Sequence, residues 1–259
     1  MIKAMIFDLD GTLVQTEKLK ALSYARAAVA LCPYKITGNE VVEAFKDVVG
    51  LSRREVAVAL VTRFDLEETA GKRMAEFEVN TSWQAFVQVR MAIYEEILSD
   101  PRVIQENQWT HNLALLEQAR QENCRVGLAT MSHCQQVQRV LEILDLRDAF
   151  DFVATRDDVE NGKPDPEIYL LVARELGVDP AECLVIEDSP SGVEAEINAG
   201  MKVVGVSTPF TRQRLHESGL LPDGHIVDNP EKLEKIIDNV IKHVSNPSEG
   251  RSASFFQSC

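Results

Sequence analysis

The sequence has few cysteines and no long hydrophobic run. Its five cysteines are odd in number and form no CxxC pair, which is typical of a protein in a reducing compartment. No strictly apolar run exceeds six residues, whereas a membrane-spanning helix needs about 20. The chain begins with a strand-like segment, MIKAMIFD, and shows no basic segment followed by a long apolar one. We therefore expect a cytoplasmic protein without a signal peptide or transmembrane helix.

Positive charge is also scarce. The chain has 27 Lys and Arg against 41 Asp and Glu, which gives a net charge of −14. Nucleic acid and anionic membranes would be repelled by such a surface, so we expect neither as a partner. A small anionic substrate is not excluded, because a metal ion and a few cations can reverse the potential inside a pocket. The expected partner is a small molecule, and the expected state is a monomer or a weak homodimer.

The length and the hydrophobic pattern predict the fold class. The 259 residues are enough for one or two domains with a core that needs no disulfide. Short apolar runs without in-and-out alternation are typical of strands covered on both faces. These runs are residues 4–9, 125–129, 152–154, 184–187, 203–206 and, as a sixth candidate, 225–227. Because helical patterns separate them, we expect an α/β fold with a three-layer parallel sheet core.

One long stretch breaks this alternation. From about residue 17 to residue 100 the pattern is helical, which is too long for a single crossover between strands. We expect residues 17–100 to form a separate helical domain, inserted into a core of residues 1–16 and 101–244. Inside it, Ser52 and Glu55 have the spacing of a helix capping box. The polar residues 245–259 are expected to form a disordered tail.

Two helices of the core carry clear end signals. A helix is expected over residues 165–176, with Asp165 as its N-cap, Pro166 at its first position and Gly177 just beyond its end. The pair Ser189 and Pro190 opens another helix in the same way. These signals fix where both expected helices of the sheet domain begin.

Polar side chains follow several of the predicted strands, at what should be one edge of the sheet. They are Asp8, Asp10, Thr130, Lys163, Glu187 and Asp188. In open α/β sheets, the ligand site lies at the carboxyl ends of the strands. We therefore expect these segments to bring acids, one hydroxyl and one lysine to a common site.

The chemistry of this set indicates phosphoryl transfer. Neighbouring carboxylates repel one another, so a cation should compensate them. Oxygen ligands without a histidine or a thiol are best suited to Mg²⁺. Mg²⁺ held by few protein ligands is typical of phosphate chemistry, in which a carboxylate nucleophile can form an aspartyl-phosphate.

Four segments resemble the haloacid dehalogenase (HAD) superfamily, in the group of β-phosphoglucomutase and phosphoglycolate phosphatase. They are FDLDGTLVQTE (residues 7–17), LATMS (128–132), GKPDP (162–166) and IEDSPSGVEAEINAGM (186–201). They stand in the order of the family motifs, and the resemblance covers roughly residues 1–240. It implies a Rossmann-like core with an inserted helical cap, whose closure would exclude water and select the substrate.

The resemblance also implies a role for each motif residue. Asp8 would be the nucleophile, and Asp10 would be the acid that protonates the leaving oxygen and then the base that activates water. Thr130 would hold the transferring phosphoryl group, and Lys163 would neutralise charge. Mg²⁺ would be held by Asp8, Asp10, Glu187 and Asp188. Substrate binding would fall to Glu17, Lys20, Arg53, Met131 and Ser132.

Three positions bear on the reaction type. Asp10 favours phosphate esters, because the dehalogenases of this superfamily lack its carboxylate. Lys20 stands where β-phosphoglucomutase has a histidine, although the stretch that ends in Arg53 resembles the mutase segment that grips a second phosphate. We therefore expect a Mg²⁺-dependent phosphatase of a small phosphometabolite, either a sugar phosphate or a phosphoglycolate-like ester. The alternatives are a β-phosphoglucomutase-like phosphomutase and a non-catalytic phosphometabolite-binding homologue.

Overall fold

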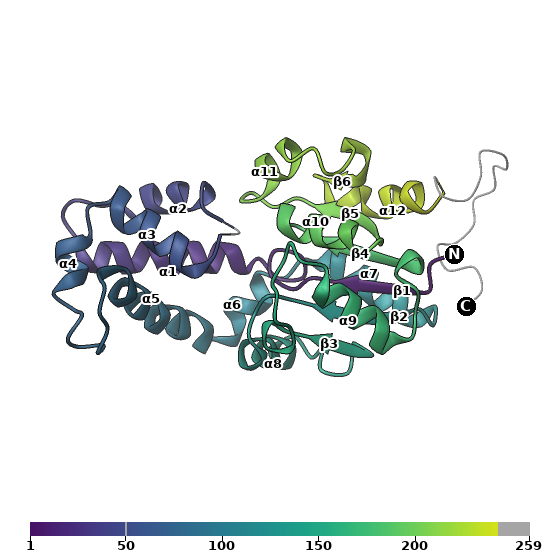
Figure 1. The fold of residues 1–259 in the computed structure, drawn as a ribbon, viewed down its shortest axis with the longest axis horizontal. Coiled ribbons are helices and arrows are strands. Elements are labelled where there is room, and N and C mark those ends of the chain that lie inside the picture. The colour runs from purple at the N-terminus through teal and green to yellow at the C-terminus, as the bar shows by residue number, and fades with distance from the viewer. Residues whose placement is uncertain (50, 243–259) are drawn as a thin grey trace. The chain divides into compact units, whose positions relative to one another are not determined.

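The computed structural model describes residues 1–49 and 51–242 (Figure 1). The chain divides into two compact units. The sheet unit consists of Met1–Gln15 and the chain from Asn107 onward, and the helical unit is Thr16–Glu106. The predicted tail of residues 245–259 lies outside the described residues.

The sheet unit contains a six-stranded sheet in which all neighbouring strands are parallel, in the order β3-β2-β1-β4-β5-β6. Its strands are β1 (Ala4–Phe7), β2 (Arg125–Ala129), β3 (Phe152–Ala154), β4 (Cys183–Glu187), β5 (Lys202–Val206) and β6 (Ile226–Val227). The predicted α/β class and its parallel sheet are confirmed. Every residue of β1 and β4 is buried, as expected of central strands covered on both faces.

Helices cover this sheet. They are α7 (Thr110–Gln121), α8 (Cys134–Ile143), α9 (Glu167–Leu176), α10 (Pro190–Asn198), α11 (Arg212–Glu217) and α12 (Leu233–Lys242). Four short 3₁₀ segments accompany them, at Arg156–Asp158, Pro180–Glu182, Asp223–His225 and Pro230–Lys232. Side chains of α9 and α10 form one apolar cluster with Ile6 of β1 and Val185 of β4. The cluster also includes Ala129, the last residue of β2, and Ala154, the last residue of β3.

The helix ends follow the local sequence closely. Helix α9 begins one residue later than a Pro166 start would give, with Pro166 at the N-cap and the Asp165 carboxylate accepting the Glu167 N–H at 3.0 Å. It ends at Gly177, whose φ of 68° is left-handed and therefore suits glycine. Helix α10 begins at Pro190, where the Ser189 hydroxyl accepts the N–H of the third helical residue.

The helical unit contains no strand among its described residues. Its helices are α1 (Thr16–Leu31), α2 (Gly38–Lys46), α3 (Arg53–Arg63), α4 (Glu67–Gly71), α5 (Ser82–Ser99) and α6 (Pro101–Glu106). Tyr24 of α1 packs against Phe45 of α2 and Phe86 of α5, with ring centroids 5.6 and 5.8 Å apart. The predicted capping box of Ser52 and Glu55 is confirmed. The unit continues to residue 106, beyond the expected boundary at 100, because α6 packs against α5.

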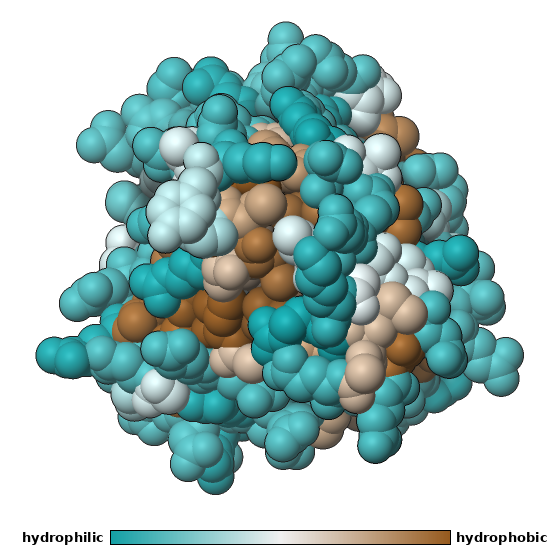
Figure 2. Space-filling model, turned by 90° about the vertical axis from the view of Figure 1, so that its left-hand side faces the viewer, coloured by the Kyte–Doolittle hydropathy of each residue, from teal (hydrophilic) through white to brown (hydrophobic). Residues whose placement is uncertain are grey.

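Hydrophilic side chains form most of the surface that Figure 2 shows, and hydrophobic residues are visible near the centre and in smaller spots along the right-hand side. The share of charged residues in the chain, 26%, is ordinary for a globular protein. Among the described residues, no helix combines the length and the apolar character needed to cross a membrane.

Candidate active site

The strand register places the predicted site residues side by side. Phe7 of β1 pairs with Leu128 of β2 on one side and with Ile186 of β4 on the other. The Asp8 N–H extends this ladder by one bond, to the Ile186 carbonyl at 3.1 Å. The residues that follow the three central strands therefore emerge at the same edge, as parallel strands require.

A tight turn follows Asp8 and ends β1 at Phe7, two residues before the predicted end. Gly11 has a φ of 87°, a left-handed value that a residue with a side chain rarely adopts. Its N–H donates to the Val14 carbonyl at 2.7 Å, and the Val14 N–H donates to the Leu9 carbonyl at 3.1 Å. The turn keeps Asp10 at the strand end, where its carboxylate accepts a hydrogen bond from the Ser132 hydroxyl.

Lys163 joins Asp8 to Glu187. Its ammonium lies 2.8 Å from Asp8 Oδ1, 2.8 Å from Glu187 Oε2 and 3.1 Å from the Ala129 carbonyl oxygen. Only 5% of its side chain is exposed. Burial alone would lower the pKa of Lys163, but the two carboxylates raise it above its usual value. Lys163 is therefore a permanent positive charge inside the acidic site.

Glu187 is held by hydrogen bonds at both of its oxygens. Oε2 accepts from Lys163 and from the Tyr169 hydroxyl, the latter at 2.7 Å. Oε1 accepts from the Ser189 hydroxyl at 2.7 Å and from the N–H groups of Ser189 and Asp188 at 3.0 and 3.2 Å. Burial alone would raise the pKa of Glu187, but Lys163 and these hydrogen bonds lower it. The lowered pKa favours the anionic form of Glu187, which forms an ion pair with Lys163.

Glycine is required at position 192 for this arrangement. A Cβ at Gly192 would lie 2.1 Å from the carboxyl carbon of Glu187, which is far shorter than a van der Waals contact. The backbone of α10 therefore approaches the Glu187 carboxylate as closely as a residue without a side chain allows.

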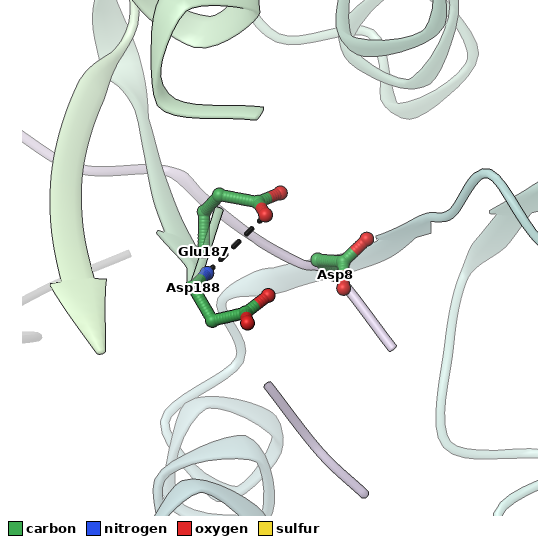
Figure 3. Close-up of side chains that lie close together, drawn as sticks. All are labelled: Asp8, Glu187 and Asp188. Carbon is green, nitrogen blue, oxygen red and sulfur yellow. Dashed lines mark hydrogen bonds between the residues drawn. The ribbon is translucent and has the colours of Figure 1, made fainter. Parts of the chain in front are cut away.

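Three buried carboxylates form a group suited to a metal ion. Asp8, Glu187 and Asp188 each place one oxygen within 4.8 Å of the others, and Figure 3 shows the side chains of Glu187 and Asp188 extending from the end of β4 toward Asp8. Oxygen is the only donor type in this group, which suits a hard divalent cation. Because protein donors engage both oxygens of Glu187, Asp8 and Asp188 are better placed to supply direct ligands.

The pKa of Asp8 indicates what such a cation would change. Burial raises this pKa well above its ordinary value, Glu187 and Asp10 raise it further, and Lys163 opposes them. A nucleophilic carboxylate must be ionised, and an added positive charge at the site favours the ionised form. The local electrostatics are therefore consistent with a cation as part of the working site.

The remaining residues predicted in the sheet unit have different surroundings. Thr130 is fully buried after β2, and its hydroxyl accepts the Ser132 N–H at 3.1 Å. Met131 packs against the apolar cluster beneath the sheet. Ser132 faces Asp10, as described above. The structure therefore brings Thr130 and Ser132 to the strand ends, while the side chain of Met131 contacts the core.

The other predicted substrate residues belong to the helical unit. Glu17 is buried in the first turn of α1, and Lys20 is half-buried one turn later. Arg53 is exposed at the first residue of α3. Their roles toward a substrate remain predictions.

Tyr169 is a site residue that the sequence patterns do not reveal. It is fully buried on α9, donates its hydroxyl proton to Glu187 and places its ring centroid 4.9 Å from the Lys163 ammonium. That distance allows a cation–π interaction. In the sequence, Tyr169 is one aromatic residue on the apolar face of a helix, so no local signal separates it from a core residue.

Comparison with known proteins identifies the family. A family model described as haloacid dehalogenase-like hydrolase matches residues 2–200. The chain is 31% identical over 206 residues to the phosphorylated carbohydrates phosphatase of Thermotoga maritima, an alignment that covers 79% of this chain and 85% of that protein. It is also 31% identical over 206 residues to the β-phosphoglucomutase of Bacillus subtilis, covering 79% and 83%.

Solved structures agree on the fold. The crystal structure of a β-phosphoglucomutase from Clostridium difficile matches with a TM-score of 0.66 at 24% identity, covering 95% of this chain and all of the other. At this level of identity the match establishes the fold. The chain belongs to the haloacid dehalogenase-like hydrolases, a phosphatase family, and is related to β-phosphoglucomutase and to sugar phosphatases.

Proposed function

We propose that this protein is a Mg²⁺-dependent phosphatase that hydrolyses a small phosphometabolite through an aspartyl-phosphate on Asp8. The observation that carries the proposal is the position of Asp8 at the end of β1. Its carboxylate lies 2.8 Å from the ammonium of the buried Lys163 side chain. Asp10 lies two residues further on and is oriented by Ser132. A nucleophile and a separate acid are what an enzyme needs and a binding module does not.

The first half of the reaction forms the covalent intermediate. An Asp8 carboxylate oxygen attacks phosphorus, and the bond between phosphorus and the substrate oxygen breaks. Asp10 donates a proton to that leaving oxygen, which departs as an alcohol. Lys163 offsets the negative charge gathered between Asp8 and the phosphoryl group. A bound Mg²⁺, held by Asp8, Asp188 and the backbone carbonyl of Asp10, would supply further charge neutralisation.

The second half releases phosphate. Asp10, now ionised, accepts a proton from water as the water oxygen attacks phosphorus. The bond between phosphorus and Asp8 breaks, and both carboxyl groups return to their starting states. The Ser132 hydroxyl orients Asp10 for both proton transfers, because it donates a hydrogen bond to one of the carboxylate oxygens.

The substrate class is proposed from the relatives. The Thermotoga maritima relative is named for phosphorylated carbohydrates, and Escherichia coli hexitol phosphatase B is 29% identical over 222 residues. We therefore propose a sugar phosphate or a similar small ester, such as a phosphoglycolate-like compound. Phosphate release from a panel of phosphorylated sugars, polyols and small acids, with and without Mg²⁺, tests this proposal directly.

Removal of divalent metal is expected to abolish phosphate release, and added Mg²⁺ is expected to restore it. Asp8 and Asp188 are hard oxygen donors, and the raised pKa of Asp8 disfavours its ionised form without a cation. Ca²⁺ should bind but support little turnover. It accepts six to eight oxygen ligands in a less regular geometry, so both oxygens of the Asp8 carboxylate can coordinate it and neither is left to attack phosphorus. Phosphate release is measured after EDTA treatment and again with each metal. Full activity in EDTA would contradict the proposed metal site.

A phosphomutase is the second candidate, because the Bacillus subtilis β-phosphoglucomutase is as similar as the sugar phosphatase. The two reactions share the intermediate on Asp8 and differ in whether water or a sugar hydroxyl removes the phosphoryl group. Lys20 argues for water, since a lysine is cationic at neutral pH and accepts protons poorly. It replaces the mutase histidine that would couple sugar binding to Asp10.

We therefore expect phosphate release in proportion to substrate consumed, with no isomeric sugar phosphate. The assay incubates the enzyme with β-glucose 1-phosphate, Mg²⁺ and catalytic glucose 1,6-bisphosphate, and it follows phosphate and glucose 6-phosphate together. Rapid, stoichiometric glucose 6-phosphate with negligible free phosphate would establish the mutase instead. The Lys20→Ala variant serves as a comparison, because a merely solvated lysine would leave the product ratio unchanged.

A further inference from the structure

Glu196 is a buried carboxyl group that the proposed reaction does not use. It lies on α10, eight residues after Asp188, and its exposed fraction is 0%. Neither of its carboxyl oxygens makes a hydrogen bond of ordinary geometry with any described residue. An ionised carboxylate in such a position would be very costly, so burial favours the neutral acid form of Glu196. A buried polar group without a partner is rare enough in native proteins to require an explanation.

The surroundings of Glu196 are the groups of the site. Burial raises its pKa well above the ordinary value, and the negative charges of Glu187 and Asp8 raise it further. Lys163 and the nearby Tyr169 hydroxyl act in the opposite direction. Helix α10 packs against α9, the helix that carries Tyr169. Glu196 is therefore buried within electrostatic reach of Tyr169, Glu187 and Lys163.

The hydroxyl oxygen of Tyr169 can still accept a hydrogen bond. Its hydroxyl proton is directed to Glu187 Oε2 at 2.7 Å, so its oxygen remains as an acceptor. A neutral carboxylic acid is a donor through its O–H group. The two groups are therefore complementary, and the Tyr169 hydroxyl is among the groups that act on the Glu196 carboxyl.

We propose that Glu196 is a positioning residue for the phosphoryl-transfer site, which donates a hydrogen bond to Tyr169 and thereby fixes the Glu187–Lys163 pair against Asp8. This rests on the proposed phosphatase function. Donation to the Tyr169 oxygen strengthens the bond from Tyr169 to Glu187, because hydrogen bonds in a chain polarise one another. Glu187 then holds Lys163 in the position in which its ammonium contacts Asp8. Glu196 touches neither substrate nor metal and acts only through this chain.

A purely structural role makes a different prediction. A methionine fills a similar volume and has no polar group to desolvate, so it should pack at position 196 at least as well. If Glu196 only filled space, Glu196→Met would stabilise the protein and leave turnover unchanged. If it positions the site, the same variant gains stability and loses turnover.

The test compares Glu196→Gln, Glu196→Met, Tyr169→Phe and the Glu196→Met/Tyr169→Phe double variant. Glutamine keeps the shape and a donor, so its kcat should stay within about threefold of the wild type. Glu196→Met should lower kcat about tenfold or more, with KM within about threefold, while its urea midpoint rises. Glu194→Met is the matched control, because Glu194 lies on the same helix but is exposed. It should change neither kcat nor KM.

The double variant shows whether Glu196 acts through Tyr169. Once Tyr169 has no hydroxyl, Glu196→Met should cost no further turnover, and the shifts of the urea midpoint should be non-additive. Wild-type kcat in Glu196→Met, equal losses in the glutamine and methionine variants, or additive losses would each overturn the proposal. Failure of the phosphatase function itself looks different, because the wild type would then release no phosphate. In that case the urea midpoints alone decide, and additive shifts overturn the coupling of Glu196 to Tyr169.

Discussion

Asp8→Asn is expected to lower kcat by about 10⁴-fold or more, which corresponds to roughly 5 kcal/mol of lost transition-state stabilisation. The amide has the shape of the carboxyl group but is no nucleophile, so the covalent intermediate cannot form. Lys163 keeps Glu187 as its partner in the variant, and one buried negative charge is removed. The fold should therefore survive, with a thermal midpoint within a few degrees of the wild type.

The measurement is phosphate release under saturating substrate and Mg²⁺, together with binding of beryllofluoride, which mimics the aspartyl-phosphate. The wild type should be inhibited by beryllofluoride, and the variant should not bind it. Asp165→Asn is the matched control, because Asp165 is exposed and only caps α9. Unchanged turnover in Asp8→Asn would rule out Asp8 as the nucleophile.

Lys163→Met is expected to lower kcat by about 10³-fold and to destabilise the fold by about 3–5 kcal/mol. The lysine is the cation that the buried Asp8 and Glu187 share, so its removal leaves two uncompensated carboxyl groups. In the variant, both carboxyl groups should have folded-state pKa values above those of the unfolded chain. The folded state then binds more protons, and its stability falls as the pH rises through those values.

The sign of this pH dependence makes the prediction specific. Urea unfolding of Lys163→Met should show a deficit against the wild type that is large near neutral pH and shrinks toward pH 5. Lys232→Met is the control, because Lys232 is exposed and belongs to none of the segments that form the site. A pH-independent deficit would mean that Lys163 matters for packing rather than for charge.

The strands and the acidic edge could be predicted because their signals are local. A short apolar run without alternation identifies a covered strand, and the carboxyl ends of parallel strands must share an edge. Asp8, Thr130 and Glu187 therefore follow from their positions after three such runs. The capping box at Ser52 was equally accessible, because it depends on a spacing of three residues.

The hydrogen bonds and contacts between the buried residues of the site could not be predicted in the same way. Tyr169 and Glu196 lie on two different helices, and their relation to Glu187 depends on how α9 and α10 pack. In the sequence both residues stand on apolar helix faces, where nothing marks a polar contact. The different hydrogen-bond partners of the three carboxylates could not be predicted for a similar reason. Only the hydrogen bonds show that Glu187 is engaged by Lys163, Tyr169 and Ser189.

The two points at which the chain leaves and rejoins the sheet unit are tied together. The Gln15 N–H donates to the Asn107 carbonyl at 2.7 Å, and the Trp109 N–H donates to the Leu13 carbonyl at 2.8 Å. For a folding chain, the long segment between β1 and β2 would ordinarily be a slow loop to close, because contact order limits folding rates. If the helical unit folds first, the long loop becomes a compact unit, and the chain segments that enter and leave it lie next to each other. Pairing of β1 with β2 would then require a much shorter effective loop than the sequence separation suggests.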